Sequence, residues 1–306
     1  MYEGLSILTG LLFASVAVGY AMAARRRLSV VPFVAICACT GSAISAVTTL
    51  NWQMLTSWRT QVLLMTLAAL GGLLGQTGMM WSVSAMKAAP RRTSSTWTLF
   101  QMTMVVPFLV ATVSGREEAA WYQWLALPAV LLAMVMVAPR RTSNAGALEP
   151  QDNMAGRNWL WFVISGFLCV GACQAVLQEI SLRGLHDALD LRPSLSLGAG
   201  GMFLWGVALA RGDRPSAAHW RIGGAAGVIV GASNITAFIA LDGLAGAGRT
   251  CLFYPIAVGV SMLSYAAFQL FTRRETLGRR MALGIACGVA GVFLLALKGI
   301  LALNGG

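Results

Sequence analysis

Several neutral polar side chains lie inside long apolar stretches of this sequence. Amide, phenol and indole groups form hydrogen bonds without carrying a charge. In apolar surroundings such groups either bond neighbouring helices to one another or contact a bound polar molecule. Gln269 lies near the end of its apolar stretch, so we give it less weight as a candidate site residue than the rest of this set. The full set is Gln76, Trp97, Gln101, Gln174, Gln178, Asn234, Tyr254, Tyr265 and Gln269.

Charged side chains avoid the centres of the same stretches. Of the 11 acidic residues, only Glu179 and Asp242 touch apolar blocks, and each comes at the end of one. Both are interpreted either as helix ends in contact with water or, together with Arg249, as the mouth of a cavity. The first apolar block contains no acid, which argues against proton exchange at a carboxylate deep in a membrane.

The sequence lacks the patterns that mark common catalytic and metal sites. It contains no HExxH, no GxSxG and no acidic cluster, and His186 and His219 lie in breaks between apolar blocks. The six cysteines lie within or at the start of apolar blocks, where a thiol behaves as a small hydrophobic group. Cys169 and Cys173 share a helix face, but no histidine is near them. We expect no enzymatic activity, no metal and no cofactor.

The composition is that of a membrane protein. Of 306 residues, 57% are hydrophobic and 11% are charged, against about 25% charged in soluble domains. The apolar blocks have the length that a hydrocarbon core of about 30 Å requires. The net charge of +11 comes from Lys and Arg in the breaks, which indicates contact with a membrane surface and not with nucleic acid. The predicted spans are 4–24, 30–50, 61–82, 94–114, 119–138, 159–180, 193–210, 222–241, 251–271 and 281–301.

A polar segment, 139–157, divides these spans into two groups of five. It is interpreted as a linker between repeats 1–138 and 158–306. Arg249 follows Arg91 by 158 residues, and Glu275 follows Glu117 by the same number. Because five is odd, the second repeat must enter the membrane from the opposite side. The predicted fold is therefore all-α and polytopic, with ten transmembrane helices in two inverted five-helix repeats, a construction typical of secondary transporters.

Charged and small residues recur at similar spacings in the two halves, and this pattern is similar to that of a known family. In both halves, small residues stand nine and sixteen positions after a glutamate, and the third span ends in Ala-Met-Lys or Ala-Leu-Asp. The chain departs from the family at Met281, where Gln is expected, and in the positions of Pro107 and Pro255. With these features the chain resembles the ten-helix, EamA-type permeases of the drug/metabolite transporter superfamily. The residues concerned are Ala85, Met86, Lys87, Glu117, Gln123, Ala126 and Ala133, and Ala240, Leu241, Asp242, Glu275, Gly284 and Gly291.

The resemblance implies a substrate cavity walled by spans one, three, four, six, eight and nine. It implies alternating-access transport of a small metabolite through the bilayer, in a bacterial inner membrane, with or without a coupling ion. Two alternatives stay open: a membrane subunit or sensor that transports nothing, and a flippase for lipid carriers. The sequence does not set the oligomeric state. The residues expected to line the cavity are Gln76, Trp97, Gln101, Gln174, Gln178, Asn234, Tyr254 and Tyr265, with Glu179, Asp242 and Arg249 at its mouth.

The charge asymmetry predicts an orientation that can be tested. Lys and Arg number 16 in the odd-numbered loops and 6 on the other face, so the positive-inside rule places the odd loops in the cytoplasm. The resemblance implies the reverse. Single cysteines in loops 25–27, 87–92 or 273–280 of a cysteine-free protein should resist a membrane-impermeant thiol reagent in intact cells. Ready labelling there would contradict the charge rule.

Overall fold

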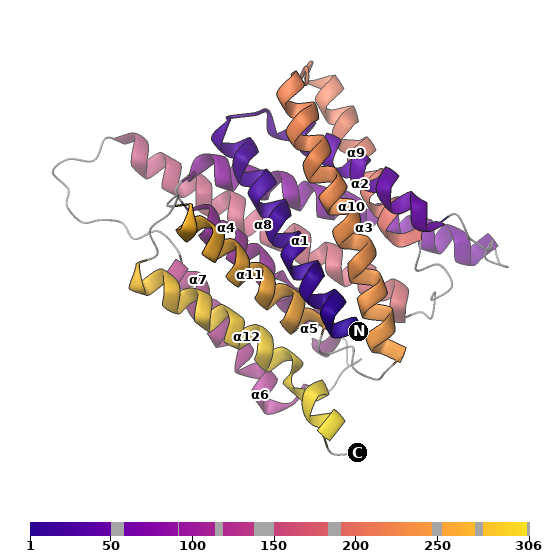
Figure 1. Cartoon of the computed structure of the whole chain (residues 1–306), viewed down its shortest axis with the longest axis vertical. Coiled ribbons are helices and arrows are strands. Elements are labelled where there is room, and N and C mark those ends of the chain that lie inside the picture. Colours follow the sequence, from indigo (N-terminus) through magenta and orange to yellow (C-terminus); the bar gives the residue numbers. More distant parts are fainter. Residues whose placement is uncertain are drawn as a thin grey trace.

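The computed structural model describes residues 1–49, 58–90, 92–113, 119–137, 150–182, 191–246, 253–272 and 278–304. All regular elements in these ranges are helices (Figure 1). The expected all-α fold is therefore confirmed for this part of the chain. The longer helices are α1 (Tyr2–Arg25), α2 (Val30–Ser45), α3 (Trp58–Ala88), α8 (Pro150–Leu182), α9 (Arg192–Ala210), α10 (Ala217–Gly246), α11 (Phe253–Phe271) and α12 (Arg279–Asn304). The shorter ones are η1 (Ala46–Thr49), α4 (Thr93–Gln101), η2 (Met102–Met104), α5 (Val105–Val113), α6 (Trp121–Trp124) and α7 (Ala126–Val137).

Within the described residues, five helices are long and apolar enough to cross a membrane: Tyr2–Arg25, Trp58–Ala88, Asn158–Leu177, Arg192–Ala210 and Ala217–Ala240. Large apolar side chains also cover the outside of the bundle. Phe271 is 88% exposed, Leu209 72% and Trp161 63%. Water does not favour such a surface, whereas lipid does. The count of ten spans and the inverted relation of the halves stay predictions.

Proline breaks two of the expected spans. Span 94–114 is divided by the 3₁₀ turn η2, which ends three residues before Pro107. Pro107 has no N–H to donate to the carbonyl of Thr103, and its ring crowds that carbonyl, so the preceding turn tightens. Span 119–138 is divided at Leu125, three residues before Pro128, for the same reason. Helix α8 begins at Pro150, so helical structure also extends into the predicted linker.

The most extensive packing joins the two halves of the chain. Helix α1 packs on α10 and α11, α2 on α9 and α10, α3 on α8 and α9, α4 on α11, and α7 on α12. Figure 1 shows the result: indigo α1 lies beside orange α10, and the yellow α12 lies along α7. The halves are interleaved rather than set apart.

Glycines permit the closest of these contacts. A Cβ on Gly72 of α3 would overlap the carbonyl oxygen of Ser196, and one on Gly200 of α9 would overlap the carbonyl oxygen of Gly72. At the crossing of α2 and α10, a Cβ on Gly231 would lie 2.9 Å from the carbonyl oxygen of Gly41. Gly200 follows Gly41 by 159 residues, and Gly231 follows Gly72 by the same number. Corresponding residues of the halves therefore make corresponding contacts.

The small residues of the family-like pattern meet where α7 crosses α12. A Cβ on Gly284 would lie 3.3 Å from the carbonyl oxygen of Ala133, and one on Gly291 would lie 3.4 Å from that of Ala126. Gln123 of α6 forms hydrogen bonds at the same interface. Its side-chain oxygen accepts from the Ala120 N–H at 3.0 Å, and its amide donates to the Leu295 carbonyl at 2.7 Å. The pattern thus marks a packing interface.

Basic segments between the apolar blocks lie together at one end of the bundle, which we call the basic end. Lys87 donates to the Leu28 carbonyl at 3.2 Å, and Arg25 donates to the Gln269 side chain at 3.1 Å. The Ser29 N–H donates to His219 Nε2 at 3.1 Å. His219 is 4% exposed and belongs to the first turn of α10, so its expected place in a loop is wrong: helix α10 begins earlier than the sequence indicates.

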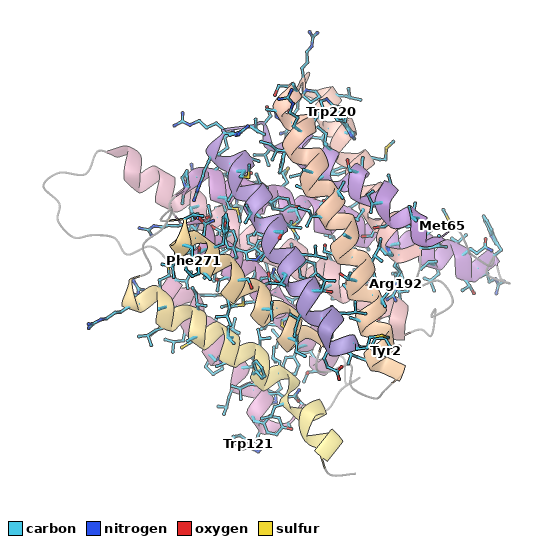
Figure 2. All side chains as sticks on the ribbon, viewed as in Figure 1. Tyr2, Met65, Trp121, Arg192, Trp220 and Phe271 are labelled. Carbon is cyan, nitrogen blue, oxygen red and sulfur yellow. The ribbon has the colours of Figure 1, made fainter. Side chains whose placement is uncertain are left out.

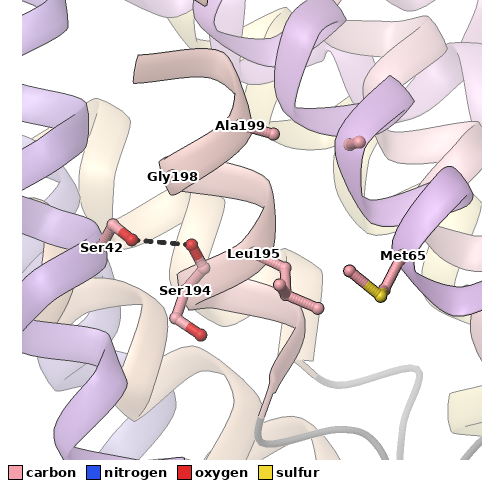
Figure 3. Close-up of a pocket in the computed structure, with 7 residues that line it drawn as sticks. Ser42, Met65, Ser194, Leu195, Gly198 and Ala199 are labelled. Atoms are coloured by element: carbon pink, nitrogen blue, oxygen red, sulfur yellow. Dashed lines mark hydrogen bonds between the residues drawn. The ribbon is translucent and has the colours of Figure 1, made fainter. Parts of the chain in front are cut away.

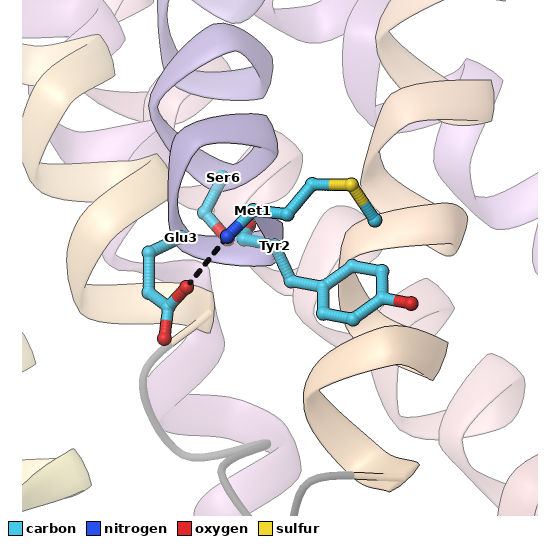
Figure 4. Close-up of polar contacts among 4 residues, drawn as sticks. All are labelled: Met1, Tyr2, Glu3 and Ser6. Atoms are coloured by element: carbon cyan, nitrogen blue, oxygen red, sulfur yellow. Dashed lines mark hydrogen bonds and ion pairs between the residues drawn. The ribbon is translucent and has the colours of Figure 1, made fainter.

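The start of α1 lies at the opposite end. The Met1 amine lies 3.5 Å from the Glu3 carboxylate, and the Ser6 hydroxyl donates to the Tyr2 carbonyl at 3.0 Å (Figure 4). Both charged groups are largely exposed, so their attraction contributes little to stability. The ring of Tyr2 covers Gly243 near the end of α10. Helices α1 and α10 are therefore antiparallel and span the bundle from end to end.

The close contact of α3 and α9 at glycine predicts how substitutions in α9 change the stability of the protein. Gly200→Ala should destabilise the protein by about 1–3 kcal/mol, because the added methyl forces α9 away from the α3 backbone. Gly206→Ala, in the same helix but with open space around it, is the matched control. It should be neutral or stabilising by up to about 1 kcal/mol because alanine is the better helix former. Unfolding of the two variants in detergent micelles provides the measurement, and equal stability of both would refute the crossing.

Candidate functional site

A cavity of about 250 Å³ lies between the two halves. Its wall is built from α1, α3, α4 and η2 of the first half and from α8, α9, α10 and α11 of the second. It therefore includes every expected wall helix and adds α9. Five of the predicted site residues line it: Gln76, Trp97, Gln101, Gln174 and Asn234.

The remaining predicted residues lie elsewhere or outside the described part. Tyr265 is 1% exposed and lies behind the wall, as does Gln269. Glu179 is partly exposed on α8 but is not in the wall. The side chains of Gln178, Asp242 and Tyr254, and the whole of Arg249, lie outside the described residues. The substrate role of the set stays a prediction.

A ladder of hydrogen bonds joins α4 to α11 beside the cavity. Thr93, Trp97 and Gln101 are spaced four residues apart on one face of α4, and Ser261, Tyr265 and Gln269 have the same spacing on α11. The Ser261 hydroxyl accepts from the Trp97 indole at 3.0 Å and from the Gln101 amide at 3.2 Å. The Thr93 hydroxyl accepts from the Tyr265 phenol at 2.8 Å and from the Gln269 amide at 3.2 Å.

The ladder ends at the basic end. Gln269 also donates to the Tyr265 oxygen at 2.6 Å and accepts from Arg25. Aromatic rings fill the space around the ladder, because Trp97 packs with its centroid 6.5 Å from Tyr20 and 6.2 Å from Tyr265. The cavity wall includes Trp97 and Gln101 but none of the last three ladder residues, Thr93, Tyr265 and Gln269. The ladder therefore closes the cavity toward the basic end.

The wall also offers hydrogen-bonding groups that face the cavity. The Gln174 side-chain oxygen is buried and, in the described part, has no hydrogen-bond partner. Asn234 uses its amide N–H to bond the Val230 carbonyl of its own helix at 2.8 Å, which leaves its oxygen to accept elsewhere. An acceptor buried in this way costs about 1–3 kcal/mol until something bonds it.

Arg192 is the wall residue that sequence reasoning missed. It is the first residue of α9, is 2% exposed, and lines the cavity. Its guanidinium lies 4.6 Å from the centroid of the Phe238 ring. The lining residues chosen from the sequence were all neutral. Arg192 adds a basic side chain to that wall, because it turns inward at the start of its helix after a polar break. The signal was the Arg-Pro pair at the edge of span 193–210.

A second hollow lies outside the bundle core, between α2, α3 and α9 (Figure 3). It measures about 420 Å³ and is lined largely by small and apolar residues. Its main polar contact is internal, because the Ser42 hydroxyl donates to the Ser194 carbonyl at 2.7 Å. It offers little to a polar ligand. Among the described residues, no three His, Cys, Asp or Glu side chains gather to hold a metal ion.

Comparisons with known proteins extend only to the fold. No family model matches the sequence, and no curated protein matches it. Solved structures do match, among them one described as "Crystal structure of protein". It is 14% identical, with a TM-score of 0.59, over 97% of this chain and 98% of that chain. The two proteins therefore share a fold along nearly their whole lengths.

Ser261 provides a test of the ladder. Ser261→Ala removes the oxygen that accepts from both Trp97 and Gln101. Because the Trp97 indole N–H is buried, its loss of a partner should cost about 1–3 kcal/mol. Ser15→Ala is the control, since that exposed hydroxyl bonds only the Leu11 carbonyl of its own helix, and it should change stability by less than about 0.5 kcal/mol. Unfolding in micelles measures both, and similar losses would contradict the ladder.

Proposed function

We propose that the chain is a secondary transporter of ten spans in two inverted repeats, which moves a small metabolite by alternating access. The support for the repeats is that contacts between the halves come in equivalent pairs. Packing of α1 on α10 corresponds to packing of α8 on α3. The approach of Gly41 to Gly231 corresponds to that of Gly200 to Gly72. A two-fold axis in the membrane plane exchanges the members of each pair.

The observation that carries the proposal is the cavity between the halves, closed toward one end by the ladder of α4 and α11. A transporter needs a site near the middle of the membrane and a barrier that forms on one side at a time. An inverted repeat supplies a second barrier by symmetry. In the state in which the ladder is broken, this second barrier would join α5 to the beginning of α11.

The strength of the ladder suits a reversible gate. Four hydrogen bonds join α4 to α11, each worth about 0.5–1.5 kcal/mol. Their sum is a few kcal/mol, comparable to the gap between two states that a protein populates in turn. All four are formed by neutral groups, so opening the gate leaves no uncompensated charge in the bilayer.

Orientation follows from the basic end. On the positive-inside rule this end is cytoplasmic, in a bacterial inner membrane, and the conformation described is closed toward the cytoplasm. The partners in this proposal are the solute and the bilayer, with or without a coupling ion. A sensor or membrane subunit would use the same fold without net movement of solute, and a lipid-carrier flippase would require a path open to the bilayer.

Cross-linking the gate tests transport directly. In a cysteine-free protein, Thr93→Cys and Gln269→Cys, whose native side chains lie 3.2 Å apart, can be joined by a short bifunctional thiol reagent. In proteoliposomes screened with amino acids, sugars, nucleosides and organic acids, the cross-linked protein should lose uptake of any transported solute. Reduction of a cleavable cross-link should restore it.

The two single-cysteine variants are the controls, and treatment with the reagent should leave the uptake of each at the level that it had before treatment. Uptake that continues through the cross-linked protein would show that opening between α4 and α11 is not needed for transport. Absence of uptake of every solute in the screen, by the unmodified protein, would favour the sensor or subunit.

A further inference from the structure

The cavity wall contains side-chain amides that use only part of their hydrogen-bonding capacity. Gln76 and Gln174 form no hydrogen bond in the described part of the chain, and the oxygen of Gln174 is buried. Gln101 donates its amide N–H to α11, and Asn234 donates to its own helix, but the oxygens of both accept nothing among the described residues. All four oxygens, but the N–H groups of only Gln76 and Gln174, are therefore left for a ligand.

Two of these amides are neighbours in the wall. Gln76 and Gln174 come directly after Gly75 and Cys173, which meet where α3 packs on α8. A Cβ on Gly75 would lie 2.9 Å from the sulfur of Cys173. Both amides line the cavity beside this contact between the halves, so one small ligand can bond both of them.

The Gln76 amide faces a part of the cavity away from charge. Arg192 is the one charged side chain among the described residues of the wall. It lies toward the end of the bundle marked by Tyr2 (Figure 2), and its guanidinium is 4.6 Å from the centroid of the Phe238 ring. Gln76 instead contacts α9 at Gly200, which follows Arg192 by two turns, about 12 Å along the helix.

Aromatic rings line the same cavity as the amides. Phe13, Tyr20, Trp97 and Phe100 belong to its wall. The face of a flat ring packs favourably against such side chains, while polar groups on its edge can reach the amides. A ligand with hydroxyls on all sides would instead place some of them against apolar rings without partners.

The chemistry of the amide decides what the edge of the ring must carry. A side-chain amide forms two parallel hydrogen bonds with a group that holds a donor next to an acceptor, as Asn and Gln do with adenine. Because the unbonded oxygens outnumber the unbonded amide N–H groups in the described wall, the ligand must bring N–H donors of its own. At about 250 Å³ the cavity is below the range of about 300–1,000 Å³ typical of drug-sized ligands, so the ligand is a small ring system.

We infer that the cavity binds a small neutral planar heterocycle with N–H groups next to carbonyl or ring-nitrogen acceptors, the chemical class of the nucleobases. The N–H groups of the ring bond amide oxygens of the wall, and the N–H groups of Gln76 and Gln174 bond its acceptors. This inference rests on the proposed function for the role of the ligand as substrate. A carboxylate on the ring would lose its hydration among neutral groups and weaken binding.

The test compares bases with analogues that lack the N–H groups. The ligands are uracil and 1,3-dimethyluracil, adenine and N6,N6,9-trimethyladenine, orotate, which is uracil with a carboxylate, and glucose. Binding to the purified full-length protein in nanodiscs is measured by calorimetry at pH 7. At least one parent base should bind, and about 10-fold or more tightly than its methylated analogue, orotate and glucose, because a methylated ring leaves buried oxygens of the wall unpaired.

Variants then assign the effect to the amides. Gln76→Met and Gln174→Met keep the length of the side chain and remove its polar end, so each should weaken binding of the base about 10- to 100-fold. The unfolding temperature should stay the same or rise, because neither amide has a partner to lose in the described part. Asn158→Leu is the matched control, since Asn158 is an exposed amide on α8, and it should bind the bases as the unaltered protein does.

Several results would overturn the inference. They are equal affinity for a base and its methylated analogue, tightest binding of orotate or glucose, absence of binding by both bases, or base binding that both methionine variants leave unchanged. A fall in unfolding temperature in both variants would assign the amides to helix packing instead. If neither variant folds, the ligand series on the unaltered protein decides.

Flux separates this inference from the proposed function. Base binding that depends on Gln76 or Gln174, without uptake into proteoliposomes, would support the site and refute transport. Uptake of orotate, glucose or another solute, with no binding of either base, would support transport and refute the base site.

Discussion

The close approach of helix backbones at glycine is the constraint on which the rest of this structure depends. In lipid, apolar side chains gain nothing by leaving one apolar surrounding for another, so helices associate through van der Waals contact and hydrogen bonds. Gly72 and Gly200 bring the backbones of α3 and α9 into contact, and Gly41 and Gly231 do the same for α2 and α10. These crossings fix how the halves interleave. They also leave the centre of the bundle to longer side chains, and it is there that the cavity forms.

The polar groups of the ladder and of the cavity wall can remain in that centre because they bond to neighbouring helices or face the cavity. The inner face of α4 shows how one helix does both. Thr93 and Trp97 bond α11, while Trp97 and Gln101 also form part of the cavity wall. The spacing of four residues keeps all three side chains on one face. A movement that breaks the ladder would therefore also reshape the wall, so the proposed transport would couple binding and gating through one short helix.

Sequence reasoning reached the class of fold and much of the wall, for physical reasons. Blocks of apolar residues have the length of a bilayer, and amides within them are costly enough to be noticed, so Gln76, Gln174 and Asn234 could be selected. Tyr265 could not be separated from the wall residues, whereas Gln269 was set aside because it lies near the end of its apolar stretch. Whether a buried amide or phenol faces a cavity or a neighbouring helix depends on rotation about the helix axis, which packing decides. Arg192 was missed because a charge next to a polar break is usually solvated.

The neutrality of the ladder suits the movement that the proposed transporter requires. A salt bridge in the ladder would be difficult to open, because separating buried charges leaves each of them unsolvated in a medium of low dielectric constant. Neutral groups such as Thr93, Tyr265 and Gln269 can exchange partners at much lower cost. Arg192 lines the cavity and takes no part in the four hydrogen bonds that join α4 to α11. In the proposed transporter, opening would therefore exchange a few neutral hydrogen bonds and would separate no ion pair within the ladder.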